Sequence, residues 1–215
     1  MKTKALLLAG LVTGAGLASL EAQTVYSVNA VGFINVEAPP GFSMVANQLS
    51  GTANKLSDVL PAPPANTRVY KFNGTGFDIY QFLGAPFNAW APDGNATFDL
   101  GGGAFVSNPT ASPLTLTFVG EVPQGTLVNS LPAGFSIRSS MVPQAGGVSS
   151  ALGFPAAAND RIYIFNGTTY DIYQLLGAPF NAWAPQEPTV NIGQSFFVFK
   201  SNAASWTRSF TVSPQ

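Results

Sequence analysis

Neither cysteine nor histidine occurs among the 215 residues of this sequence. Without cysteine the chain has no disulfide and no thiolate nucleophile, and without histidine it has no imidazole to act as a base near neutral pH. The two absences also remove the usual ligands of zinc and iron. We therefore expect a protein that holds no metal ion and no cofactor, and whose stability comes from apolar packing.

Charged side chains are also scarce. They make up 9 % of the residues, against roughly a quarter in an average soluble domain. No basic stripe is present, which argues against nucleic acid as a partner. A surface covered mainly by neutral polar groups protects poorly against association, so we expect copies of this chain to bind one another.

The N-terminal segment reads MKTKALLLAGLVTGAGLASLEAQ, two lysines followed by an apolar run and then by small residues. This pattern is typical of a secretory signal peptide. The apolar run falls below the roughly 20 residues that span a bilayer, which disfavours a membrane anchor. We predict that residues 1–22 are cleaved off after Ala22 and that the mature protein is secreted, extracellular or on the cell surface, with no membrane span.

The rest of the chain is an internal repeat. A shift of 93 positions aligns Gly41 with Gly134 and Pro92 with Pro185 without a gap, and 26 of these 52 positions are identical. After a one-residue deletion, LGGGAFVSNP aligns with IGQSFFVFKS. A period this long indicates a domain rather than a solenoid unit. We predict a first module at residues 23–123 and a second at residues 124–215.

Each copy has the composition of short strands joined by turns. Segments rich in Val, Thr and Phe alternate with Gly, Pro and Asn, and NKLSDVLP has the pattern of a short helix that ends at Pro61. Asn73-Gly74 and Asn166-Gly167 predict type I′ hairpin turns, in which both residues have positive φ. The predicted fold is all-β, with two tandem homologous β-sandwich or small barrel domains of six or seven strands each.

The residue types that remain do not form a catalytic constellation. No Gly-x-Ser-x-Gly element is present to expose a serine nucleophile. Asp78 and Asp171 occupy equivalent positions in separate copies, which makes them poor partners in one glycosidase pair. We therefore predict that the protein is not an enzyme.

One segment is repeated almost without change. Residues 78–92, DIYQFLGAPFNAWAP, return at 171–185 as DIYQLLGAPFNAWAP with 14 of 15 identities, against 12 of 37 for residues 41–77. The aromatic residues could fill each small core, or the segment could form a surface for sugar or for self-contact, or a recent duplication could explain the identity. The candidate contact residues are the same six in each copy: Asp78, Tyr80, Gln81, Phe87, Asn88, Trp90, Asp171, Tyr173, Gln174, Phe180, Asn181 and Trp183.

The order GFSMVANQL, LSDVLP, VYKFNGTGFDIY, AW and LGGGAFVSNP resembles a module that recurs in bacterial secreted and cell-surface proteins. That module reads Gly-aromatic-Asn-Leu-Ile-Ser/Ala-Asn-Pro-Leu, then a short helix, VYxYxGxxY, a lone Trp, LxxGxGF and a closing strand. Here Ser43 replaces the usual Asn, and the second copy has SSMVP in place of the Asn-Pro-Leu element. The resemblance covers nearly all of the mature chain and implies a secreted β module, without an activity.

Two functions are compatible with these features. The first is a structural or adhesive surface protein that self-associates, with filaments formed by strand addition as one form of assembly. The alternative is a carbohydrate-binding protein with one aromatic site per module, built on Tyr80, Trp90, Tyr173 and Trp183. We also predict that residues 24–31 supply a strand that the first module needs, because LTLTFVGEV, residues 114–122, is expected to serve the second module.

Overall fold

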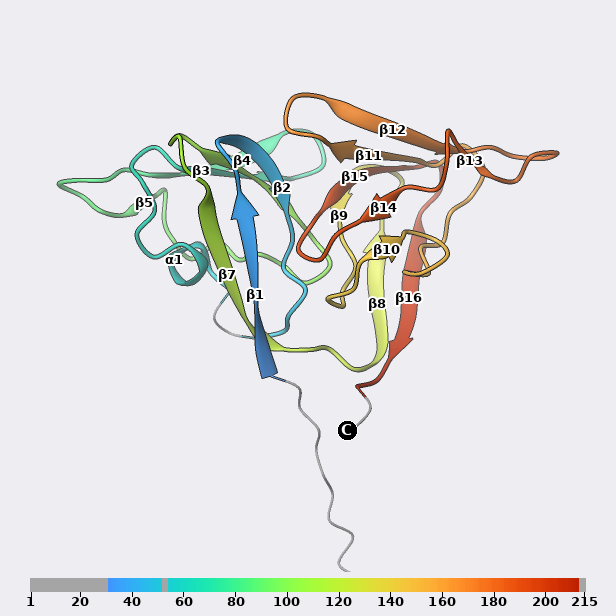
Figure 1. Cartoon of the computed structure of the whole chain (residues 1–215), viewed down its shortest axis with the longest axis horizontal. Coiled ribbons are helices and arrows are strands. Elements are labelled where there is room, and N and C mark those ends of the chain that lie inside the picture. Colours follow the sequence, from blue (N-terminus) through green and yellow to red (C-terminus); the bar gives the residue numbers. More distant parts are fainter. Residues whose placement is uncertain (1–30, 52–53, 213–215) are drawn as a thin grey trace, which may run out of the picture.

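The computed structural model describes residues 31–51 and 54–212. In this part of the chain there are sixteen strands and one short helix, α1 (Leu56–Val59), which confirms the predicted all-β class and the predicted helical turn (Figure 1). The strands form several open sheets, and none of the sheets in the described ranges closes on itself. The strands of the described residues therefore do not form the small barrels that we considered as an alternative.

The first half of the chain contains one five-stranded sheet and one two-stranded ribbon. The sheet has the order β2-β6-β3-β4-β5, and the ribbon pairs β1 with β7. The bounds are β1 (Val31–Ala38), β2 (Gly41–Val45), β3 (Arg68–Phe72), β4 (Phe77–Phe82), β5 (Trp90–Ala91), β6 (Ala104–Asn108) and β7 (Leu114–Glu121).

The second half repeats this arrangement. Its sheet has the order β13-β12-β11-β15-β9, its ribbon pairs β8 with β16, and β10 pairs with β14. The bounds are β8 (Gly125–Leu131), β9 (Gly134–Arg138), β10 (Gly146–Gly147), β11 (Arg161–Phe165), β12 (Tyr170–Leu175), β13 (Trp183–Ala184), β14 (Thr189–Val190), β15 (Phe196–Lys200) and β16 (Ala204–Phe210). The strands that correspond under the sequence repeat therefore occupy the same places in both sheets.

Each ribbon packs against the inner face of the sheet in its own half. In the first half Leu116 and Phe118 of the ribbon meet Val69 and Val106 of the sheet in one apolar cluster. In the second half Leu131 and Trp206 of the ribbon join Ile162 and Val198 of the sheet in a second apolar cluster. Burial of apolar surface at about 25 cal/mol per Å² makes these two cores the main source of stability, since the described residues have no disulfide.

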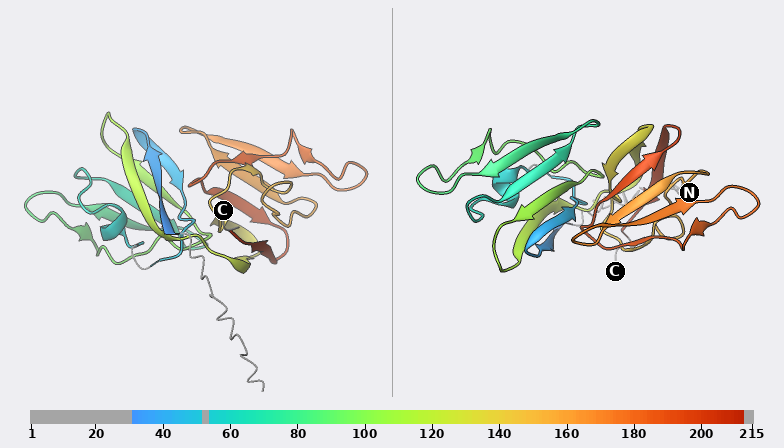
Figure 2. Two further views of the ribbon diagram at one scale, coloured as in Figure 1. Left: turned by 60° about the horizontal axis from the view of Figure 1, so that its bottom comes forward. Right: turned by 90° about the horizontal axis from the view of Figure 1, so that it is seen from above.

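The two halves lie side by side and contact each other reciprocally (Figure 2). The backbone N–H of Ala46 donates to the carbonyl of Gly193 at 2.8 Å, and the equivalent N–H of Ser139 donates to the carbonyl of Gly101 at 2.9 Å. A Cβ on Gly103 would lie 2.2 Å from that of Ser195, its own counterpart in the repeat. Such exchange of equivalent contacts is the signature of a two-fold relation, here within one chain.

One sequence-based prediction about strand pairing is wrong. The segment LTLTFVGEV does not serve the second half: it forms β7, which pairs with β1 in the first half, while the second half uses β8 in that place. The strand predicted at residues 24–31 lies outside the described residues except for Val31, which belongs to β1, so it stays a prediction.

The hairpin turns also differ from the prediction. Only Gly74 and Gly167 have positive φ, and each loop has four residues rather than two. The cause is the asparagine side chain, because Asn73 Oδ1 accepts hydrogen bonds from the backbone N–H groups of Thr75 and Gly76 at 3.2 and 2.9 Å. This Asx turn fixes the chain direction without a second residue of positive φ.

Candidate functional site

The near-identical segments form an edge strand, a loop and a short pairing strand in each half. Residues 83–89 connect β4 to β5, and residues 176–182 connect β12 to β13. These two loops reach the opposite ends of the longest axis of the molecule (Figure 1). A segment with a single role in the core would not extend so far from it.

Four of the twelve candidate contact residues hold the sheet of their own half. Asp78 accepts a hydrogen bond from Asn73 Nδ2 at 2.9 Å, and Gln81 bridges Arg68 and Asn66 with two bonds of 2.9 Å. Asp171 and Gln174 make the equivalent contacts with the corresponding residues of the second half. These side chains are identical in both copies because each one completes the same local turn or bridge.

The aromatic candidates Trp90 and Tyr80 point toward the first core. Trp90 is only 7 % exposed, its Nε1–H donates to the carbonyl of Leu60 at 3.1 Å, and its ring packs edge-on against Phe82 at 5.7 Å. Tyr80 packs partly buried against the same cluster. Trp183 and Tyr173 pack against the second core in the same way. Trp90 therefore fills the first core, and Trp183 packs partly buried against the second.

The remaining candidates stand in the protruding loops. Phe87 and Phe180 are 70 % and 71 % exposed. The expectation that the aromatic residues of this segment fill the core is therefore wrong for these two phenylalanines. Asn88 and Asn181 both have φ of 44°, and the N–H of each closes its loop onto Gly84 or Gly177. Both loops thus present an exposed phenylalanine just before an asparagine of positive φ, although Gly84 has φ of 63° and its counterpart Gly177 does not have positive φ.

The strands β4 and β12 are open along most of one edge. On that side β4 pairs with β5 only through Gln81 and Phe82, and β12 pairs with β13 only through the equivalent two residues. In the described part of the chain no strand lies beside residues 77–80 or 170–173 on this side. The exposed apolar side chains of Phe77, Ile79 and Ile172 mark these edges.

Sequence reasoning missed a second set of aromatic residues, on the outer faces of the two sheets. Tyr70, Phe105 and Phe197 belong to one cluster that joins both halves, and Phe72 meets Phe197 edge-on at 5.2 Å. The signal is present in the sequence, because RVYKF and FFVFK are apolar at both odd and even positions. A strand with that pattern is covered on both faces, whereas strict alternation marks a strand with one wet face.

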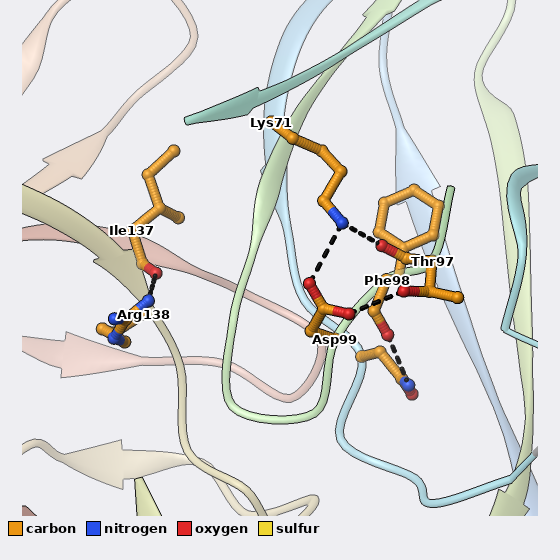
Figure 3. A network of polar contacts seen from close by, with 7 residues as sticks. Lys71, Thr97, Phe98, Asp99, Ile137 and Arg138 are labelled. Carbon is orange, nitrogen blue, oxygen red and sulfur yellow. Dashed lines mark hydrogen bonds and ion pairs between the residues drawn. The ribbon is translucent and has the colours of Figure 1, made fainter. Parts of the chain in front are cut away.

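A polar hollow of about 240 Å³ lies between the halves, beside Asp99. Lys71 Nζ contacts the Asp99 carboxylate at 3.0 Å and the Thr97 carbonyl at 2.6 Å, and Thr97 Oγ1 donates to Asp99 at 2.6 Å (Figure 3). Arg138 of β9 lines the same hollow and donates through Nε to the Ser130 carbonyl.

The chemistry of this hollow is that of a fixed ion pair. Burial opposes ionisation of Asp99, but the hydrogen bonds from Thr97 and Lys71 outweigh it, so the pKa of the Asp99 carboxyl lies below its usual range. An acid that stays ionised at neutral pH is poorly placed to act as a general acid. Among the residues that the structure describes, no group of three or more Asp and Glu is placed to hold a metal ion.

No protein-family model, curated protein or solved structure matches this chain. Over residues 31–51 and 54–212, none of the helical structure has the length and apolarity needed to cross a bilayer.

Proposed function

We propose that this protein is a secreted, non-catalytic structural or adhesive protein made of two tandem modules, and that copies of it associate through the open edges of β4 and β12. The observation that carries the proposal is the pair of unpaired edges at residues 77–80 and 170–173. An open edge presents backbone N–H and C=O groups that pair readily with a strand of another chain.

The sequence of these edges favours pairing. Edge strands are commonly protected by lysine, proline or a bulge, whereas β4 and β12 place Ile79 and Ile172 there, 52 % and 55 % exposed. Neither segment, FDIY or YDIY, contains lysine or proline. The only charged side chain in each segment is Asp78 or Asp171, which is bound to the asparagine of its own hairpin turn. The protection at these edges is therefore limited to one carboxylate each.

The number of edges determines the form of the assembly. The proposal uses one open edge in each half, among the several strand edges that lack a ladder partner in the described residues, so a molecule that pairs through both β4 and β12 holds two neighbours at once. A repeated contact that does not close into a ring produces a filament. The proposal thus includes filaments built by strand pairing, with the loops at residues 83–89 and 176–182 beside each contact.

Lysine at both edges tests this function. We expect the Ile79→Lys, Ile172→Lys double variant to lose the concentration-dependent oligomers of the parent and to sediment as a monomer, because two like charges would face each other in every paired edge. Light scattering across a hundredfold range of concentration, with negative-stain microscopy, measures the loss.

The matched control carries the same added charge elsewhere. Val119→Lys with Val128→Lys changes two valines of similar exposure on the ribbon strands β7 and β8, away from β4 and β12, and should leave the oligomers in place. If both double variants are equally monomeric, charge rather than edge pairing is responsible. If the parent itself is a monomer throughout, the proposal fails.

Trp90 and Trp183, the tryptophans predicted to bind carbohydrate, are poorly placed to stack on a sugar. A sugar ring stacks on an aromatic face that solvent can reach, and Trp90 is buried with its indole N–H already bonded to Leu60. Trp183 is half-buried, with its Nε1–H donated to Ser149 at 3.1 Å. We therefore favour self-association as the function of the repeated segment.

A further inference from the structure

Two aromatic hollows lie where the outer faces of the two sheets meet. The first has a volume of about 470 Å³. Its wall comes from the second half of the chain, and one side comes from the β3–β4 hairpin of the first half. Phe135, Tyr163, Tyr170 and Phe197 form the wall, and the hairpin contributes Phe72 and Thr75.

The second hollow is the counterpart of the first under the internal repeat. Its volume is about 440 Å³, its wall comes from the first half, and the β11–β12 hairpin of the second half forms its side. The wall residues are Phe42, Tyr70, Phe77 and Phe105, which correspond to the four wall residues of the first hollow, and the hairpin contributes Phe165 and Thr168. Both volumes fall within the roughly 300–1,000 Å³ of small-molecule sites.

The lining of both hollows is uncharged but not wholly apolar. Aromatic rings dominate it, and hydroxyl groups come from Tyr163 and Thr75 in the first hollow and from Tyr70 and Thr168 in the second, while Tyr170 lines both. Burial raises the pKa of Tyr170, so its phenol stays protonated at physiological pH and can both donate and accept a hydrogen bond. A ligand that fits must offer apolar faces and hydroxyl groups, and needs no charge.

We propose that each hollow is a binding site for a neutral oligosaccharide. A pyranose ring has C–H faces that pack on aromatic rings and a rim of hydroxyls that match the Tyr and Thr hydroxyls. An anionic or cationic ligand would find no opposite charge among the lining residues, and would lose its hydration without compensation. The internal repeat gives two such sites per chain. This inference does not require the proposed strand pairing, although Phe77 and Tyr170 belong both to the hollows and to the proposed pairing edges.

The exposed wall residues provide the test. Phe42 and Phe135 are equivalent, 44 % and 46 % exposed, and not in any buried cluster, so their truncation leaves the fold intact. Binding of cellotriose, mannotriose and N-acetylated chitotriose is measured by isothermal titration calorimetry, with trigalacturonic acid as the charged comparison. We expect at least one neutral trisaccharide to bind at two sites per chain and trigalacturonic acid not to bind.

The variants then locate the sites. Phe135→Ala should remove one of the two sites, and Phe42→Ala with Phe135→Ala should weaken binding about tenfold or more, as is usual for truncation of a central aromatic contact. Phe87→Ala, outside both hollows, should bind like the parent. The proposal is overturned if none of the neutral trisaccharides binds, if the double variant binds unchanged, or if a proline-rich peptide occupies the hollows instead.

Discussion

Replacing Lys200 with methionine is expected to lower the free energy of unfolding by roughly 3–5 kcal/mol. The Lys200 ammonium and the Asp160 carboxylate are in contact and are both almost completely buried. The ammonium also donates to the carbonyl of Pro155 at 2.8 Å and lies 5.4 Å from the centre of the Phe154 ring. Its removal leaves the Asp160 carboxylate buried without a cation. Urea denaturation followed by far-ultraviolet circular dichroism measures the loss.

The internal repeat supplies a control for this prediction. The first half has the neutral residues Thr67 and Asn108 at the positions of Asp160 and Lys200, both buried and hydrogen-bonded. The double variant Asp160→Thr, Lys200→Asn should therefore recover most of the stability, because no charge stays unpaired. Lys71→Met breaks an exposed ion pair and should cost at most about 1 kcal/mol. Equal losses for Lys71→Met and Lys200→Met would contradict the prediction.

Trp90→Ala is expected to cost roughly 3–5 kcal/mol. The indole ring is buried against Phe82, and its truncation leaves a cavity together with an unpaired carbonyl at Leu60. Because the sheet of the first half packs through this region, we expect a lower melting temperature by circular dichroism.

Phe87→Ala changes an equally large side chain in the same near-identical segment. At 70 % exposure it should shift the free energy of unfolding by no more than about 0.5 kcal/mol. The pair of variants divides the segment into a buried anchor and an exposed loop. If Trp90→Ala is as mild as Phe87→Ala, the tryptophan is not a core residue in solution.

The repeat and the all-β class could be predicted from the sequence because both leave local signals. Identity at a constant shift shows the repeat directly, and Val, Thr and Phe between Gly and Asn mark strands. The helical turn at Leu56–Val59 was predicted for the same reason, since Pro61 limits its length. These features depend on residues close together in the chain.

The features that the sequence did not reveal depend on distant pairing. LTLTFVGEV is β-prone in any register, and only the structure shows that it pairs with β1 rather than serving the second half. The burial of Trp90 and the exposure of Phe87, three residues apart, follow from the loop that turns between them. The aromatic hollows require both halves at once, so no pattern within one copy could show them.

Hydrogen exchange at increasing protein concentration tests edge pairing most directly. If copies associate through β4 and β12, the outward-facing backbone amides of Phe77, Ile79, Tyr170 and Ile172 should become protected as the concentration rises, because the alternate amides already face β3 and β11. The amides of the β1–β7 ribbon should keep the same rates. Oligomers that form without any gain in protection at these four positions would contradict the account, because the strands proposed to pair would still be open to water.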